Sequence, residues 1–341
     1  MSGRTLRLIA ALSAAVFISS CSLHSKPETE EAEQTRAETA NVTVPATDAS
    51  QKERTMLVSK LKTLRDPFVL YDNGLYYMYG TGWTVYRSRS LEGKWMGGLS
   101  AVKDPPDCAG DRWAPEVYRF GNRYIMVTTY KSRATGHRGC SVFESSSPEG
   151  PFKEISDGHV TPRDWDSIDG TLFTETDGTV WMVFVHEWTS TDDGVGRMAC
   201  AQMSEDLTHF VSEPVELFRA DDPEWAMGKV TDGCFLHRSS DGTLVMIWSN
   251  WDSGGYCVGQ AKSQTGKVTG PWIQLDERLY SSTLPCSGGF DGGHGMIFSD
   301  GNGKLWMSVH SPNSEKSGRN ATPVFIPLKE ENGILIRDIP Q

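Results

Sequence analysis

The stretch DGTLFTETDGTVWMVF, which begins at Asp169, decides the fold because the chain repeats its pattern five times. Each copy has a short apolar strand, a turn rich in Gly or Asn, and a second apolar strand that contains a methionine. Such a pair of strands predicts a β-hairpin. The other four copies read DPFVLYDNGLYYMYG from Asp66, APEVYRFGNRYIMVT from Ala114, DGCFLHRSSDGTLVMIW from Asp232 and HGMIFSDGNGKLWMSV from His294.

A third strand and a closing turn follow the hairpin in four of the copies, as in VYRSRSLEGKW from Val85 and SVFESSSPEGPF from Ser141. The repeating unit is therefore a small antiparallel sheet. Five sheets in succession, with almost no helical periodicity, predict an all-β, five-bladed β-propeller. A β-sandwich is the main alternative, but it would not explain five units that share a methionine, which we interpret as packing between blades.

Alignment of the copies by methionine and turn predicts that five residues share one place at the start of the first strand. They are Asp66, Ala114, Asp169, Asp232 and His294. The first strand of each blade lines the central channel of a propeller, so three aspartates and one histidine should face one another. Asp-Gly also occurs as turn punctuation, but here the hairpin turns lie further along each copy.

Gathered carboxylates repel one another, which separates their pKa values and leaves an acid beside a base. Hydrolysis of a glycoside needs that pair, because one group protonates the leaving oxygen while the other activates water or attacks the sugar. A ring of carboxylates could instead bind Ca²⁺. We expect no required cofactor and no catalytic metal, with an axial Ca²⁺ near His294 as the alternative use of the site.

Four short motifs, in order along the five repeats, resemble glycoside hydrolase family 43. They are Arg65-Asp66-Pro67, Ser167-Ile168-Asp169-Gly170-Thr171-Leu172-Phe173, Thr231-Asp232-Gly233 and Gly293-His294-Gly295. The resemblance implies a five-bladed propeller and an inverting mechanism on arabinose, xylose or galactose linkages of plant polysaccharides. By the same resemblance Asp66 matches the general base, Asp169 the carboxylate that tunes and orients the acid, and Asp232 the acid.

The family usually has Glu where this chain has Asp232, and Asp is one methylene shorter. Three outcomes follow from this difference. Asp232 could act as the acid with the backbone moved inward, Glu187 at the end of a second strand could take the role, or the protein could have lost hydrolysis and kept glycan binding.

Further residues are expected to contact substrate at the rim. The tryptophans at strand ends could stack on sugar rings, Arg65 could bind a hydroxyl or steady Asp66, and Glu116 could touch substrate or make a core hydrogen bond. Axial His294 matches a family histidine that holds water or a metal. The full set of expected binding residues is Arg65, Trp83, Trp113, Glu116, Glu187, Trp188, Trp251 and His294.

The N-terminus predicts export. Residues 1–21 combine a basic start with an apolar run too short to span a bilayer, and Ile18-Ser19-Ser20-Cys21 resembles a bacterial lipobox that would lipidate Cys21. Residues 22–55 lack aromatic residues and predict a flexible tether, followed by the catalytic propeller at 56–341. We therefore expect a lipoprotein at the cell envelope, periplasmic or on the outer surface, whose lipid is its sole contact with the membrane.

Composition limits the partners. A formal net charge of -11 without a basic run argues against nucleic acid, and we expect a monomer that binds an oligosaccharide or polysaccharide. Six cysteines besides Cys21 would permit disulfides. The leading hypothesis is an exo-acting α-L-arabinofuranosidase. A β-xylosidase, a β-galactosidase and a non-catalytic glycan-binding lipoprotein are the alternatives.

Overall fold

The computed structural model describes residues 56–339 apart from residues 62, 286 and 314–319. All regular structure in that part of the chain is β-strand, arranged in five antiparallel sheets. The prediction of an all-β five-bladed propeller is confirmed. The signal sequence, Cys21 and the tether lie outside the described residues. Among the described residues no helix is long and apolar enough to cross a membrane.

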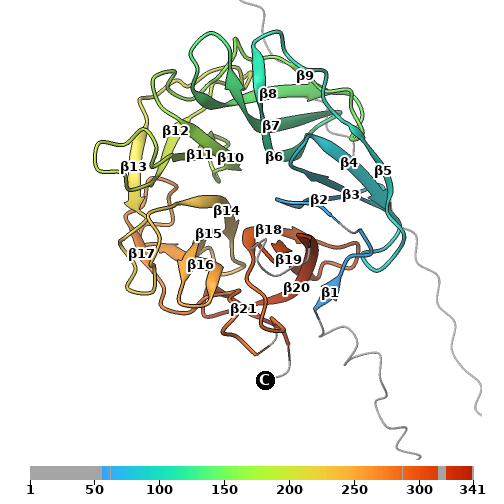
Figure 1. Ribbon diagram of the computed structural model, residues 1–341, viewed down its shortest axis with the longest axis vertical. Helices are drawn as coiled ribbons and strands as arrows, with labels where there is room; N and C mark the ends of the chain where they lie inside the picture. Colours follow the sequence, from blue (N-terminus) through green and yellow to red (C-terminus); the bar gives the residue numbers. More distant parts are fainter. Residues whose placement is uncertain (1–55, 62, 286, 314–319, 340–341) are drawn as a thin grey trace, which may run out of the picture. The chain divides into compact units, whose positions relative to one another are not determined.

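Each of the first four blades is a meander of four strands in chain order (Figure 1). The first has β2 (Phe68–Asp72), β3 (Leu75–Gly80), β4 (Thr84–Ser88) and β5 (Met96–Ser100). The second has β6 (Cys108–Phe120), β7 (Arg123–Ser132), β8 (Arg138–Ser145) and β9 (Lys153–Glu154). The third has β10 (Ser167–Thr174), β11 (Val180–His186), β12 (Arg197–Gln202) and β13 (Val215–Arg219). The fourth has β14 (Asp232–Arg238), β15 (Leu244–Asp252), β16 (Gly255–Ser263) and β17 (Trp272–Gln274).

The fifth blade closes the ring with a strand from the start of the propeller. It contains β18 (Gly293–Ser299), β19 (Leu305–Ser311) and β20 (Thr322–Glu331), and β20 pairs with both β21 (Ile334–Arg337) and β1 (Leu57–Val58). The β1 pairing joins Leu57 to Phe325. Hydrogen bonds between the beginning and the end of the propeller therefore hold the last blade in place.

The first strand of every blade faces the centre of the propeller, as Figure 1 shows for β2, β6, β10, β14 and β18. Each of these strands contacts the next, and β18 contacts β2, so the inner strands form a closed ring. The predicted convergence of the strand starts on one end of the axis depends on this arrangement.

The five repeated methionines lie on the second strands and are fully buried. They are Met78, Met126, Met182, Met246 and Met307, each 0% exposed. They belong to the four hydrophobic clusters that fill the space between the sheets. Their prediction as packing residues is confirmed.

The cysteines of the described region are unpaired. Cys108, Cys140, Cys200, Cys234 and Cys257 are all buried free thiols, while Cys286 lies outside the described residues. The packed sheets supply the stability that small disulfide-rich domains take from cross-links.

Candidate active site

One backbone position recurs at the channel end of every blade. It lies three residues before the residue that pairs with the shared methionine, and we call these five residues the ring positions. All of them have positive φ angles, between 42° and 56°. The ring positions are Asp66, Ala114, Asp169, Gly233 and His294.

The fourth ring position corrects the sequence alignment by one residue. Gly233 occupies it, and Asp232 lies one residue earlier on β14. A side chain at Gly233 would clash, because its Cβ would lie 2.7 Å from the Cα of His294. The prediction that Asp232 shares a place with Asp66 and Asp169 was therefore wrong in register. It was correct in location, because Asp232 still reaches the same cluster.

Irregular pairing explains how the ring residues turn toward the axis. The ladders of β6, β10, β14 and β18 each shift register beside the ring position, as a β-bulge does when it re-aims a side chain. A residue other than glycine in the left-handed region costs about 1–3 kcal/mol and is retained where the surroundings impose it. Asp66, Ala114, Asp169 and His294 all carry that strain, and three of these four have titratable side chains at the same end of the channel.

Side chains from neighbouring strands hold the ring backbone. Each ring N–H donates to a side-chain acceptor, and in four cases the acceptor lies three residues after the methionine of the preceding blade. Those four bonds are Ala114 to Thr81 Oγ1 at 3.2 Å, Asp169 to Thr129 Oγ1 at 3.0 Å, His294 to Ser249 Oγ at 2.9 Å, and Asp66 to His310 Nδ1 at 3.3 Å. In the third blade this place is Val185, which cannot accept, and the Gly233 N–H donates instead to Asp169 Oδ2 at 3.0 Å.

Asp66 is held in its ionised form. Its Oδ1 lies 3.3 Å from Nδ1 of His294 and 3.3 Å from Nδ1 of His310, and Thr81 donates a hydrogen bond to Oδ2. Burial would raise the pKa of this carboxyl, but the contacts with the two histidines and Thr81 outweigh burial and hold its pKa well below the ordinary value. An ionised carboxylate in this place can accept a proton from water.

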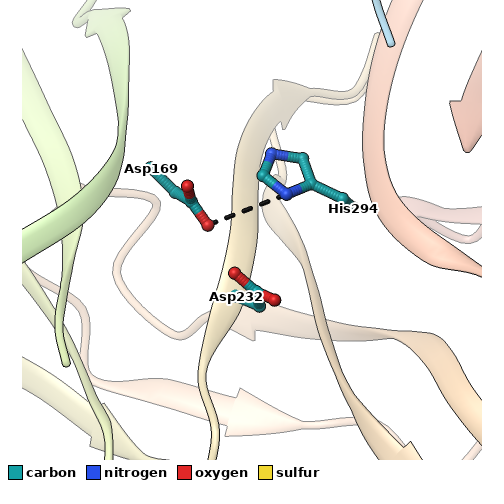
Figure 2. A group of neighbouring side chains, drawn as sticks. All are labelled: Asp169, Asp232 and His294. Atoms are coloured by element: carbon teal, nitrogen blue, oxygen red, sulfur yellow. Dashed lines mark ion pairs between the residues drawn. The ribbon is translucent and has the colours of Figure 1, made fainter. Parts of the chain in front are cut away.

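Asp232 is held in its protonated form beside Asp169. One ligand atom from each of Asp169, Asp232 and His294 lies within 4.8 Å of the others, and Figure 2 shows their side chains converging. Burial, and then the charge of Asp169 and the hydrogen bond to it, raise the pKa of Asp232 well above its usual range. Tyr256 donates a hydrogen bond of 2.7 Å to Asp232 Oδ2.

Asp169 lies between the two states. Burial raises its pKa to about 6, against hydrogen bonds from Asp232 and from the Gly233 N–H that favour the ionised form. Near neutral pH it is therefore mostly ionised and accepts a hydrogen bond from the protonated Asp232. The contacts thus shift the pKa values of Asp66 and Asp232 in opposite directions, as an acid beside a base requires.

Glu116 makes a core hydrogen bond, which was one of its two expected roles. It is buried beside the Tyr118 hydroxyl, which lies 2.8 Å from Thr171 Oγ1 and accepts the Leu172 N–H. Burial raises the pKa of Glu116 to about 8, so it is mostly neutral at pH 7. It also lines, with Asp66 and His294, a cavity of about 10 Å³, the space of a single water molecule.

Glu187 is engaged in a buried ion pair. Arg138 donates from Nε to Glu187 Oε2 at 2.7 Å and from Nη2 to Oε1 at 2.9 Å. The same guanidinium lies 5.3 Å from the centre of the Trp113 ring. Burial raises the pKa of Glu187 in spite of Arg138, but both of its oxygens accept hydrogen bonds from the guanidinium and it lies outside the axis cluster of Asp169, Asp232 and His294. The geometry therefore favours Asp232 over Glu187 as the acid.

We expect Glu187→Gln to destabilise the fold rather than to remove the chemistry. Loss of the charged hydrogen bonds to Arg138 should lower the free energy of unfolding by about 1–3 kcal/mol, measured by urea denaturation. The exposed pair of Glu149 and Arg87, 2.6 Å apart, supplies the control, since Glu149→Gln should cost less than about 1 kcal/mol. A folded Glu187→Gln protein without activity would return Glu187 to the list of candidate acids.

The tryptophans divide into one core residue and three partly exposed ones. Trp83 is 0% exposed and donates from Nε1 to Thr128 Oγ1 at 2.7 Å, so its expected stacking on sugar is wrong; the ring fills the contact between blades instead. Trp113, Trp188 and Trp251 remain partly exposed, and Trp251 packs 4.7 Å from the ring of Tyr256. These three stay candidates for contact with a sugar ring.

Arg65 is exposed and bonded away from the carboxylates. Its Nη2 donates to Asn313 Oδ1 at 2.6 Å, and the same oxygen lies 3.0 Å from His310 Nε2. Asp66 therefore has one neighbour that the sequence did not point to, His310. Arg65, which was expected to bind a hydroxyl or steady Asp66, bonds to Asn313, whose Oδ1 also lies next to His310. His310 is 1% exposed.

The axial group fits a Ca²⁺ ion poorly. Asp169, Asp232 and His294 offer two carboxylates and one imidazole, whereas Ca²⁺ takes six to eight oxygen ligands in proteins. One oxygen of each carboxylate already accepts a hydrogen bond, from the Gly233 N–H or from Tyr256. We assign no step of the chemistry to a metal.

An ionised carboxylate and a protonated one at the axis of a five-bladed propeller define a glycosidase of the propeller class. The chain belongs to the glycosyl hydrolases family 43, whose family model matches residues 61–326. It is a glycoside hydrolase, and its substrates are oligosaccharides or polysaccharides.

Two solved structures and one curated relative are similar to this chain. The crystal structure of an endo-arabinase from Bacteroides thetaiotaomicron is 35% identical, covers 82% of this chain and 98% of its own, and has a TM-score of 0.72. An endo-1,4-beta-xylanase from the same organism is 26% identical over 81% of this chain and 94% of its own, with a TM-score of 0.67. An extracellular exo-alpha-(1->5)-L-arabinofuranosidase from Cellvibrio japonicus is 22% identical over 64% of this chain and 69% of its own length.

Proposed function

We propose that this protein is an inverting exo-glycosidase that releases terminal α-L-arabinofuranose from plant polysaccharides or their oligosaccharides. The observation that carries the proposal is the pairing of Asp66, held ionised, with Asp232, held protonated, around Asp169 and His294. Inversion needs a base that activates water and a separate acid on the leaving side.

In the proposed reaction Asp66 removes a proton from a water molecule as the water oxygen attacks the anomeric carbon. The bond between that carbon and the glycosidic oxygen breaks, and Asp232 gives its proton to the departing oxygen. Asp169 accepts the hydrogen bond from Asp232 and keeps the acid oriented. The products are a free sugar of inverted configuration and a shortened chain, and proton exchange with solvent restores both carboxyls.

Arabinofuranose is favoured because two of the compared proteins are named for arabinan or arabinofuranoside cleavage, and the endo-arabinase is 35% identical along nearly its whole length. Exo action is named for the relative that is 22% identical. The xylanase, at 26%, is less similar than the endo-arabinase. A β-xylosidase or β-galactosidase on the same carboxylates is therefore the second choice.

The proposal is tested by hydrolysis of nitrophenyl α-L-arabinofuranoside, β-D-xyloside and β-D-galactoside, together with arabinan and xylan oligosaccharides. We expect the arabinofuranoside to be cleaved fastest, single arabinose units to be released, and proton NMR to detect the β-anomer first. Release of the α-anomer first would overturn inversion. Binding of oligosaccharides with no cleavage of any compound would instead indicate a glycan-capture protein.

We also propose that the protein is exported and anchored by a lipid on Cys21 at the cell envelope. The support is the sequence of residues 1–21, which lie outside the described structure. Incorporation of labelled palmitate that persisted in a Cys21→Ser variant would contradict it.

A further inference from the structure

The fifth blade supports a ring position with a different kind of side chain from the other blades that provide such an acceptor. Four ring N–H groups donate to a side chain that lies three residues after a shared methionine. The acceptor is a hydroxyl oxygen in three of them and an imidazole nitrogen in the fourth. The residues are Thr81, Thr129 and Ser249 for the hydroxyls and His310 for the imidazole. The three hydroxyls show that a small neutral acceptor is sufficient to hold the backbone. The fifth blade therefore carries a bulkier, titratable group for a reason other than this hydrogen bond.

His310 contacts the carboxylate of Asp66 as well as its backbone. Its Nδ1 lies 3.3 Å from the Asp66 nitrogen and 3.3 Å from Asp66 Oδ1. The other ring nitrogen, Nε2, faces Asn313 Oδ1 at 3.0 Å, an oxygen that also accepts from Arg65 Nη2. An amide oxygen only accepts, so Nε2 carries a proton. Nδ1 then accepts from the Asp66 N–H when the ring is neutral and donates to the Asp66 carboxylate when the ring is charged.

The same imidazole packs on the residue that binds the proposed acid. The ring of Tyr256 is stacked 5.7 Å from the ring of His310, and its hydroxyl donates to Asp232 Oδ2 at 2.7 Å. Gly293 makes this packing feasible, because a Cβ there would lie 2.4 Å from the Tyr256 ring. Both His310 and Tyr256 are almost fully buried, so neither can move away without opening the core.

We propose that His310 is a positioning residue for the hydrolytic reaction. It fixes the amide and the carboxylate of the general base Asp66 and, by packing on Tyr256, sets the position of Asp232 relative to that base. This inference rests on the proposed function, because it assigns a role within the same pair of carboxylates. His310 does not touch the reacting atoms, and Asn313 with Arg65 orients its ring.

Several groups face Asp66 besides His310, and a test must separate their effects on the Asp66 carboxylate from the effect of His310. They are His294 from β18, Thr81 from the end of β3, and Asp169 from β10, whose negative charge opposes that of Asp66. His310 itself is faced by Asp66, Tyr256 and Asn313, with Arg65 beyond Asn313. Loss of His310 leaves the contacts of Asp66 with His294 and Thr81 in place. The activity that depends on Asp66 should therefore fall without being abolished.

The test is the pH profile of kcat/KM for His310→Asn. The Asn amide oxygen can take the place of Nδ1 as the backbone acceptor, while the charge and the contact with Asn313 are lost. We expect the acid limb of the profile, which reports the base, to move to higher pH by about one unit, since a cationic neighbour lowers a carboxyl pKa by about that amount or more. We expect kcat to fall about tenfold and KM to change less than twofold.

Ser249→Ala supplies the comparison, because it removes the equivalent hydrogen bond at the ring position of His294 and leaves the side-chain contacts of Asp66 in place. Its acid limb should move less than that of His310→Asn. A second variant, Asn313→Ala, keeps the imidazole and removes its orienting partner, so its limb should move in the same direction by a smaller amount. Thermal melting confirms that each variant is folded.

A titration of ¹³C-labelled aspartate carboxyls by NMR gives a readout that does not need activity. In the wild-type protein the resonance that disappears in Asp66→Asn should titrate at lower pH than in His310→Asn. An active wild-type enzyme whose acid limb and Asp66 titration are the same in His310→Asn would overturn the inference. A wild-type protein that hydrolyses nothing, yet shows the shifted titration, would overturn the proposed function and leave the contact of His310 with Asp66 supported.

Discussion

Asp66→Asn is expected to lower kcat/KM by about 10³-fold on every substrate that the wild-type enzyme cleaves, within the range that general bases contribute. Asparagine has the size of aspartate but cannot take a proton from water. The hydrogen bond from Thr81 can still be accepted by the amide oxygen, and the backbone bond to His310 does not involve the replaced atoms. The measurement is steady-state hydrolysis, with the melting temperature taken alongside.

Asp241→Asn is the matched control for that variant. Asp241 lies at the hairpin turn of the fourth blade, away from the ring positions, and its Oδ1 accepts the Thr243 N–H, which the amide oxygen can also do. Its kcat/KM should stay within twofold of wild type. An Asp66→Asn protein that kept more than a tenth of wild-type activity would remove Asp66 from the role of base.

Small external anions should restore part of the activity to Asp66→Ala. The shortened side chain leaves room for azide, which is already a nucleophile and needs no base. The product would be a glycosyl azide of inverted configuration, identified by NMR. Recovery of the free sugar alone would argue against an open place at the position of the attacking water.

The repeat pattern predicted the blades because it is local. Alternating apolar residues, turn residues and one buried methionine recur within each hairpin, and the packed clusters around Met78 and Met246 follow from them. Asp66 and Asp169 were predicted to face each other for the same reason, since they lie 12 and 13 residues before the methionine of their own hairpin. The closing strand β1 was not predicted, because Leu57 pairs with Phe325 and no repeat links the two.

The register of Asp232 was wrong because the alignment followed the Asp-Gly pair and not the number of residues to the methionine. Asp169 and His294 each lie 13 residues before their methionine, and the residue 13 before Met246 is Gly233. Thr231-Asp232-Gly233 looks like Ile168-Asp169-Gly170 in sequence, yet the aspartate occupies the ring position in the third blade and the glycine does in the fourth. Gly233 is the residue that fits there, since His294 leaves no room for a Cβ. The equal count of residues to the methionine was the signal that could have corrected the alignment, and glycine is the residue type that tolerates positive φ there.

His310 and Trp83 illustrate the other limit. His310 lies 244 residues from Asp66 in the chain, inside an apolar strand where a single histidine has no distinguishing neighbours. Trp83 lies between two short strands, and from sequence such a residue can lie at the rim or in the interior. It is buried because its ring packs against Tyr130 and Phe143 of the second blade. Contacts between blades fixed both residues, and a single sequence contains no direct record of such contacts.

Asp232→Asn is the second large effect, and it should depend on the leaving group. Asparagine cannot protonate the departing oxygen, so cleavage of an arabinan oligosaccharide should fall by about 10³-fold. A dinitrophenolate leaves without protonation, so hydrolysis of dinitrophenyl α-L-arabinofuranoside should fall by less than about tenfold. The alkaline limb of the pH profile should also vanish, because the raised pKa of Asp232 produces that limb in the wild type.

Asp232→Glu tests whether the shorter side chain of Asp232 limits proton donation or whether the backbone already places its carboxyl correctly. If the bulged backbone at Gly233 brings Asp232 far enough inward, the added methylene will push the carboxyl against Tyr256 and Asp169, which now bond it, and activity on oligosaccharides should fall several-fold. A rise in activity would mean that reach limits the natural enzyme. Equal losses for Asp232→Asn on both leaving groups would show that Asp232 does not donate the proton, and Glu187 would then require release from Arg138 before it could do so.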